Sequence, residues 1–85
     1  MNNFEALKKA LEQCEANIGK LTSAQMENAM AHMDRMAPGF GRGAAFFRAI
    51  DRVVGNESFL APVTQDQFAA YLANKREMLE NNKYL

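Results

Sequence analysis

Glycine occupies every second position from Gly39 to Gly43, and this stretch limits the fold more than any other part of the chain. Inside a helix, each glycine costs about 1 kcal/mol relative to alanine. Pro38 directly precedes the stretch, and a residue before proline avoids helical geometry. Because the sequence on both sides has helical periodicity, residues 38–43 are predicted to form a glycine-rich turn between two helices.

Apolar residues recur at three- and four-residue steps along the chain, which is the period of an amphipathic helix. This pattern predicts four helices, at about residues 3–18, 23–37, 43–54 and 65–81. Thr22 and Thr64 each precede a glutamine by three residues, which is the spacing of a capping box at a helix start. No segment alternates polar and apolar residues as a strand would. The predicted fold class is therefore all-α, a compact four-helix domain that spans residues 1–85.

Each predicted helix contributes one apolar row to the core. The rows are Phe4/Leu7/Leu11, Met26/Met30/Met33, Phe46/Ile50/Val53 and Phe68/Leu72/Leu79, and the first continues through Cys14 to Ile18. The methionine row has three interpretations: core packing, an adaptable binding groove, or the seam of a homodimer. Lys75 falls inside the fourth row. Either its ammonium reaches solvent past an apolar stem, or it marks where the row leaves the core and meets a partner.

Ten basic and ten acidic residues cancel, so no overall field draws the chain to nucleic acid or to a membrane. The charge is uneven, however: residues 35–52 hold four Arg and one Asp, a net charge of +3. Arg42, Arg48 and Arg52 are expected to project along one side of the third helix and its lead-in. They could bind an acidic protein surface. Nucleic acid is the less favoured partner, because the acidic segments on both sides of these arginines weaken the attraction to phosphates.

The glycine-rich turn itself has three interpretations. Its backbone N–H groups could cradle a phosphate with Arg42 as counter-charge, although the Lys-Ser/Thr of a P-loop is missing. Phe40 could instead insert into a partner while Arg42 pairs with an acid, since aromatic residues and Arg lead interface hot spots. In the third interpretation, Phe40 folds back onto the core of its own chain.

No catalytic or metal-binding constellation is present in the sequence. Cys14 is the single cysteine, which excludes an internal disulfide and a cysteine-based metal site. His32 is the single histidine and lacks nucleophile or carboxylate partners at a suitable spacing. We therefore expect no enzymatic activity, no metal and no cofactor. No secretion signal or membrane-spanning run is found, which leads us to expect a cytoplasmic protein.

These observations predict a small non-enzymatic protein-binding module that docks on a larger macromolecule and inhibits or adapts it. A phage or mobile-element inhibitor of a host defence complex is one instance of this class. The predicted partner-binding residues are Phe40, Arg42, Arg48 and Arg52, and the predicted partner has an acidic surface. A homodimer through the methionine-rich helix stays open. The alternative is a nucleic-acid-binding regulator that uses the arginine-bearing face of the third helix.

Overall fold

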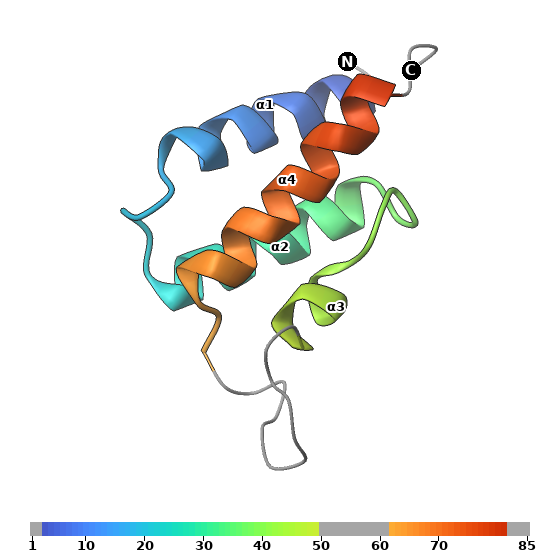
Figure 1. Cartoon of the computed structure of the whole chain (residues 1–85). Helices are drawn as coiled ribbons and strands as arrows, with labels where there is room; N and C mark the ends of the chain where they lie inside the picture. Colours follow the sequence, from blue (N-terminus) through green and yellow to red (C-terminus); the bar gives the residue numbers. More distant parts are fainter. Residues whose placement is uncertain (1–2, 50–61, 82–85) are drawn as a thin grey trace.

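Four helices make up the part of the chain that the computed structural model describes, residues 3–49 and 62–81 (Figure 1). They are α1 (Asn3–Ala16), α2 (Ser23–Met36), α3 (Ala44–Ala49) and α4 (Gln65–Asn81). No strand occurs within these described ranges. The predicted all-α class with four helices is confirmed. The predicted continuation of the third helix over residues 50–54 lies outside the described residues.

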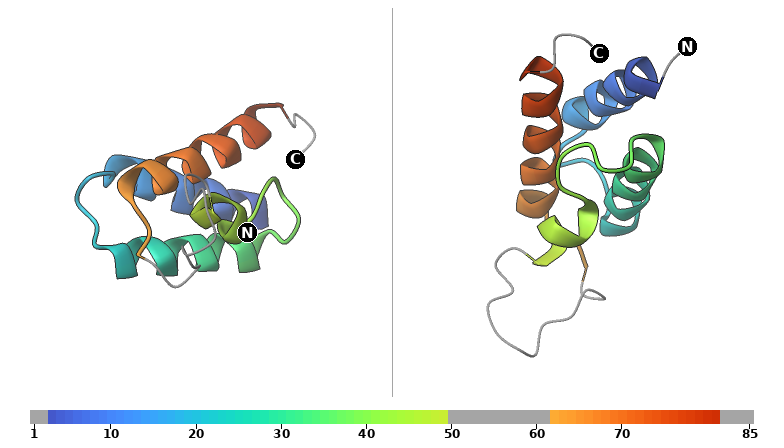
Figure 2. Two further views of the ribbon diagram at one scale, coloured as in Figure 1. Left: turned by 60° about the horizontal axis from the view of Figure 1, so that its bottom comes forward. Right: turned by 90° about the vertical axis from the view of Figure 1, so that its right-hand side faces the viewer.

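The helices pack around one shared interior. α1 and α2 run in opposite directions, and α4 packs against both of them (Figures 1 and 2). The short α3 packs against α2 and α4. Residues 37–43, which we call the central loop, join α2 to α3 and run beside α4 in the right-hand view of Figure 2. This arrangement places the glycine-rich stretch between two long helices.

Every helix contributes side chains to the buried core. The buried apolar side chains are Leu7, Leu11, Cys14, Met26, Met30, Met33, Phe47, Val63, Phe68, Tyr71 and Leu72. Burial of apolar area at about 25 cal/mol per Å² is the main source of stability for so small a chain. Met26, Met30 and Met33 are each at most 2% exposed within a single copy. Of the three interpretations of the methionine row, the structure therefore supports core packing for these three side chains.

Both predicted capping boxes are present. The Thr22 side chain accepts a hydrogen bond from the Gln25 amide at 3.1 Å, and the Gln25 side chain accepts one from the Thr22 amide at 2.8 Å. Thr64 and Gln67 exchange the same pair of bonds at 3.1 and 3.0 Å. Each box satisfies two amides that the first turn of a helix leaves without partners. This local chemistry explains why α2 and α4 begin at their predicted residues, 23 and 65.

The first helix is shorter than predicted, ending at Ala16 and not at residue 18. The Asn17 amide donates to the Cys14 carbonyl at 3.1 Å, a three-residue bond that tightens the chain out of the helix. Ile18, predicted to extend the apolar row, is consequently 40% exposed. The following turn is fastened to α4, because the Gln65 side chain accepts from the Gly19 amide at 3.0 Å and donates to the Leu21 carbonyl at 3.1 Å.

Phe46 was predicted in the core row of the third helix, and this prediction is wrong. Phe46 is 45% exposed, whereas its neighbour Phe47 is buried and packs edge-on against Tyr71 with ring centroids 5.7 Å apart. Neighbouring side chains on a helix point about 100° apart. The six-residue α3 therefore directs only one of its two adjacent phenylalanines toward the protein core. Phe46 is left on the surface.

Candidate interaction surface at the central loop

The central loop is held against α4 by hydrogen bonds to its backbone. The Lys75 ammonium donates to the carbonyl oxygen of Phe40 and, at 2.8 Å, to that of Arg42. One residue earlier on α4, the Asn74 side chain accepts from the Arg42 amide at 2.9 Å. Two neighbouring side chains of α4 therefore bind the loop backbone, one through an amide group and the other through two carbonyl groups.

Lys75 differs from both interpretations made from the sequence. The residue is buried, with 2% exposure, so the ammonium does not reach solvent and does not lie on a surface where a partner could contact it. The two loop carbonyls and the face of the Tyr71 ring, 4.9 Å away, surround the charge. Burial lowers the pKa of Lys75, and the charge of Asp34 partly opposes that effect. A lysine in an apolar row must find such partners, because a buried unpaired ammonium is very costly.

Asp34 holds the other end of the loop. One oxygen of its carboxylate accepts from the Ala44 amide at 2.9 Å, at the start of α3. The other accepts from the Tyr71 hydroxyl at 2.6 Å, and that hydroxyl also lies 3.1 Å from the Met30 carbonyl. Burial is the larger cause that raises the pKa of Tyr71, and the hydrogen bond to Asp34 raises this pKa further. Residues of α2 and α4 thus fix where α3 begins.

Two glycines of the loop have backbone angles that other residues rarely adopt. Gly39 and Gly41 have φ angles of 77° and 73°. At Gly41 a Cβ atom would lie 2.5 Å from the Asn74 side-chain oxygen, whereas at Gly39 it would meet open space. Gly41 therefore suits this turn by its backbone angle, and a Cβ atom there would have to displace the Asn74 side chain that accepts from the Arg42 amide.

The loop geometry does not support the phosphate-cradle interpretation. The amides of Phe40, Arg42 and Ala44 already donate to the Ala37 carbonyl, the Asn74 side chain and the Asp34 carboxylate. A carboxylate thus occupies the position at the start of α3 that a bound anion would need. Repulsion between that carboxylate and a phosphate would oppose binding.

Phe40 lies against the core, as the third interpretation of the turn expected. Its ring packs edge-to-face on Phe4 of α1, with centroids 5.3 Å apart, and its side chain is half-buried. The exposed part of this contact borders an open groove lined by Phe4, Met36, Ala37, Pro38, Gly39 and Phe40. Phe40 is consequently a wall of a groove, and its role in partner binding stays a prediction.

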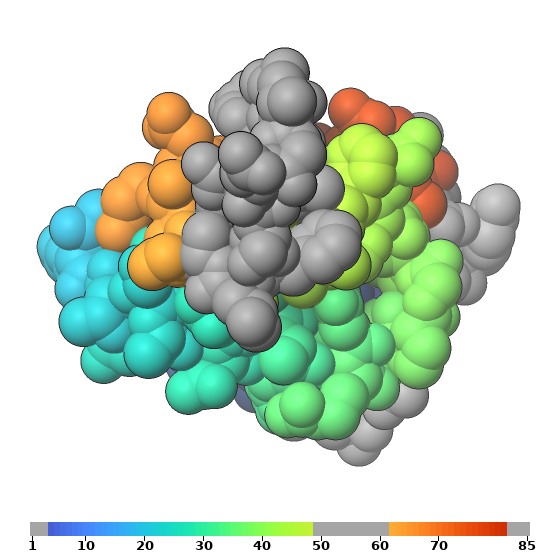
Figure 3. Space-filling model, turned by 90° about the horizontal axis from the view of Figure 1, so that it is seen from below, coloured from blue at the N-terminus to red at the C-terminus, as the bar shows by residue number. Residues whose placement is uncertain are grey.

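Arg42 and Phe46 form an exposed pair next to the loop. The guanidinium carbon of Arg42 lies 4.4 Å from the centroid of the Phe46 ring, the geometry of a cation–π contact. Arg42 is exposed, and its backbone is fixed by Asn74 and Lys75. Figure 3 shows α3 and the central loop at one side of this face of the molecule, beside α2. We call Arg42 and Phe46 the stacked pair.

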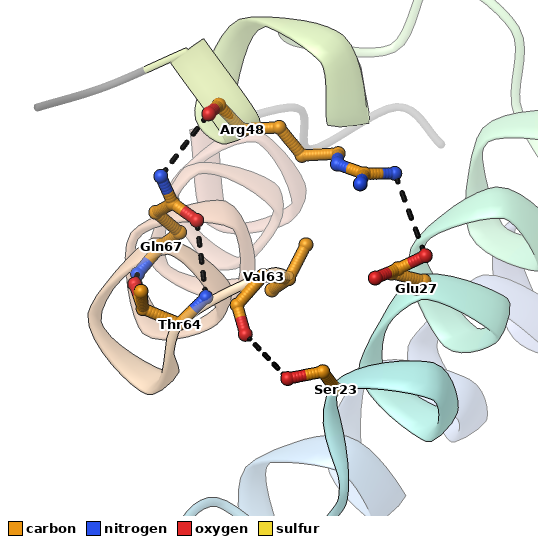
Figure 4. Close-up of polar contacts among 6 residues, drawn as sticks. All are labelled: Ser23, Glu27, Arg48, Val63, Thr64 and Gln67. Carbon is orange, nitrogen blue, oxygen red and sulfur yellow. Dashed lines mark hydrogen bonds and ion pairs between the residues drawn. The ribbon is translucent and has the colours of Figure 1, made fainter. Parts of the chain in front are cut away.

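Arg48 lies apart from the stacked pair, between α3 and α2. Its guanidinium is 3.6 Å from the Glu27 carboxylate, and its carbonyl accepts from the Gln67 side chain at 3.1 Å (Figure 4). Ser23 of α2 donates to the Val63 carbonyl at 2.9 Å in the same view. Arg48 is half-buried, so it serves the packing of three segments. The fourth predicted site residue, Arg52, lies outside the described residues.

Several residues of this region were not predicted from the sequence. Asp34, Asn74 and Tyr71 hold the loop, and Phe46 carries its exposed aromatic ring. One signal was available: a lysine inside an apolar row requires acceptors, and the backbone of a turn has carbonyls that no helix satisfies. Nothing in the sequence paired that lysine with that turn, because they are more than 30 positions apart.

Cys14 and His32 are the remaining polar candidates from the sequence. Cys14 is buried, and burial together with the neighbouring Glu15 raises the pKa of its thiol, which opposes formation of the reactive thiolate. His32 is exposed on α2. Among residues 3–49 and 62–81, no three metal-binding side chains gather. Within the same ranges, no helix has the length and apolar character to cross a membrane.

Comparison with protein-family models, curated proteins and solved structures finds no match to this chain. Inference about function therefore starts from the central loop, the groove beside it and the stacked pair.

Proposed function

We propose that this chain is a non-enzymatic protein-binding module that docks on a larger macromolecule through the stacked pair. The supporting observation is the exposed Phe46 ring, 45% accessible, with the Arg42 guanidinium 4.4 Å above it. Aromatic and arginine side chains dominate the binding energy of protein interfaces. Phe46 contributes less to its own core than the buried Phe47 does, and its exposed face can contact a partner.

The support beneath the stacked pair favours recognition by a preformed surface. Lys75 and Asn74 fix the backbone of Arg42, and Asp34 fixes the start of α3, which carries Phe46. Association costs free energy whenever it must order loops and side chains. A loop that is already held by its own chain avoids most of that cost. The module would then bind with little change in its backbone.

The charge around the loop favours a partner with an acidic surface. Residues 35–50 contain no Asp or Glu, and Arg35 and Arg42 are exposed within that range. Opposite charge on a partner would speed association and suppress wrong partners. A protein that acts in the cytoplasm to inhibit or adapt a larger complex, such as a phage or mobile-element inhibitor of host defence, is one instance of this proposal.

Two other assignments have weaker support. A nucleic-acid interface on α3 would need Arg48, which is half-buried and paired with Glu27. A homodimer through α2 would have to use residues other than Met26, Met30 and Met33, which a single copy already buries. Both remain alternatives that the following experiment separates from the proposal.

The test compares three tagged proteins in capture from a bacterial lysate, with and without nuclease. They are the parent, the surface variant Arg42→Ala/Phe46→Ala, and the control Gln13→Ala/Lys20→Ala, which changes exposed residues of α1 and of the turn after it. We expect the parent and the control to retain the same proteins after nuclease, and the surface variant to lose them. Identical retention by all three would remove the stacked pair from the function. Loss on nuclease treatment would instead indicate nucleic acid, and recovery of only the chain itself would indicate self-association.

A further inference from the structure

The groove beside Phe40 is open and apolar. Its lining comes from one residue of α1, Phe4, and from the last residue of α2 with the loop that follows, Met36 to Phe40. Its volume is about 290 Å³. Small-molecule and cofactor sites usually occupy roughly 300–1,000 Å³ and enclose most of the ligand. An open groove of this size suits one or two side chains of a protein segment better than a cofactor.

The charge beside the loop side of the groove is positive, whereas the exposed Glu5 follows the lining residue Phe4 on α1. The lining residues 36–40 are flanked by two exposed arginines, Arg35 before them and Arg42 after them. The backbone of Arg42 is also adjacent in space to that of Phe40, because the Lys75 ammonium contacts both of their carbonyls, while the Arg42 guanidinium lies over the Phe46 ring. An apolar occupant with carboxylates on either side would complement both the lining and the rim.

The residues that line the groove are held in place by contacts with the rest of the chain. Phe40 is packed on Phe4 and tied to α4 through Lys75, and Met36 and Ala37 pack against the buried core. A side chain can therefore enter the groove without rearrangement of the loop. A preformed pocket of this kind suits an anchor side chain from a partner.

We infer that this groove receives an apolar anchor side chain from an acidic segment of the partner protein. The segment would place an aromatic or aliphatic side chain in the groove, against the exposed parts of Phe4 and Phe40, with its carboxylates near Arg35 and Arg42. This inference rests on the proposed function and names the chemistry of the partner. It adds the groove as a second contact region, and Arg42 is common to the rim of the groove and the stacked pair.

The experiment titrates the full chain, labelled at backbone ¹⁵N and at methionine methyl ¹³C, with blocked synthetic hexapeptides. The probe is Glu-Glu-Phe-Leu-Glu-Glu. One comparison peptide replaces the four Glu with Lys, and another replaces Phe-Leu with Ala-Ala. We expect the probe to shift the Met36 methyl signal and the Gly39 and Phe40 amide signals, and both comparison peptides to shift them far less. Unmoved signals with the probe, or equal shifts with the lysine peptide, would overturn the inference.

A pair of charge-reversed variants provides a matched control. Arg42→Glu changes the rim of the groove, whereas Lys20→Glu makes the same change of charge at the turn after α1, at the far end of that helix from Phe4 (Figure 1). Loss and reversal of one exposed ion pair predicts about two- to fivefold weaker binding of the probe by Arg42→Glu. Lys20→Glu should bind as the parent does. Equal weakening by both variants would show binding to the overall charge and contradict the groove.

This experiment fails separately from the capture experiment. If the probe leaves Met36 unmoved while Arg42→Ala/Phe46→Ala still loses its captured proteins, the groove inference falls and the proposed function stands. If capture does not depend on the stacked pair, the proposed function falls whatever the peptides do.

Discussion

The ammonium of Lys75 donates hydrogen bonds to the backbone carbonyls of Phe40 and Arg42, so a buried charge of α4 holds the loop between α2 and α3. The desolvation of a buried ammonium is costly unless its donors are satisfied. Here the glycine-rich backbone supplies the acceptors, and Asp34 and Tyr71 lie in the same polar region. The loop and the lysine therefore stabilise each other.

Replacing Lys75 with methionine keeps most of the apolar stem and removes the donors. We expect Lys75→Met to lower the free energy of unfolding by about 1–3 kcal/mol, because two carbonyls lose a charged donor in a partly buried place. Urea denaturation followed by circular dichroism measures the change. The control Lys20→Met alters an exposed lysine and should stay within about 0.5 kcal/mol of the parent. A Lys75→Met protein as stable as the parent would contradict the role of the ammonium.

The two loop glycines with positive φ angles make a matched pair of substitutions. Gly39→Ala should cost about 1–2 kcal/mol, the usual penalty for a left-handed angle in a residue with a Cβ atom. Gly41→Ala should cost at least about 1 kcal/mol more, because its Cβ would lie 2.5 Å from the Asn74 oxygen and displace the acceptor of the Arg42 amide. Thermal unfolding of both variants measures the difference. Equal losses would mean that the loop does not approach α4 this closely.

The stability of the chain should fall as the pH rises above about 10. The pKa of Tyr71 is raised above its ordinary value of 10.0, so the unfolded chain loses this proton first and the folded state is disfavoured at higher pH. Lys75 acts in the opposite direction between its lowered pKa and 10.5, because there the unfolded chain binds the extra proton.

The Tyr71→Phe variant isolates the contribution of the hydroxyl. It should lose about 1–3 kcal/mol at neutral pH, where the hydroxyl donates to the Asp34 carboxylate. Its stability should then fall less than that of the parent between pH 9 and 11, because the phenol that opposes folding at high pH is gone. Urea denaturation across this range compares the two proteins. Parallel pH profiles would show that Tyr71 does not titrate as the geometry requires.

Truncation of the core should be far more costly than truncation of the exposed turn. Leu11 is fully buried, and Leu11→Ala should lose about 2–5 kcal/mol. Ile18→Ala removes similar apolar volume at a residue that is 40% exposed and should lose less than about 1 kcal/mol. Thermal melts of the two variants test the assignment of the first apolar row. Equal melting temperatures would contradict the packing of α1.

The parts of the fold that depend on local chemistry were predicted well. The capping boxes at Thr22 and Thr64 work within four residues, so their spacing in the sequence is enough to place α2 and α4. The apolar rows of α1, α2 and α4 were also predicted from local spacing, because the helical period relates residues only three or four positions apart. The end of α1 depended on a turn fastened by Gln65, a distant residue, and was placed too far along.

The parts that depend on distant partners were predicted poorly. Lys75 was assigned to solvent or to a partner, because the sequence shows the charge in an apolar row and not the carbonyls that satisfy it. Arg48 was grouped with Arg42 on one face, yet Glu27 of α2 holds Arg48 elsewhere. Phe46 was assigned to the core because periodicity alone does not say which of two adjacent aromatic rings a short helix buries.

Amide hydrogen exchange of the central loop tests most directly whether α2 and α4 hold it in one conformation. The amides of Phe40, Arg42 and Ala44 have acceptors, whereas within the described residues those of Gly39, Gly41 and Gly43 have none. We predict an alternating pattern, with protection factors at 40, 42 and 44 at least about tenfold above those of the three glycines. Exchange of all six amides at the rate of an unstructured chain would contradict the account.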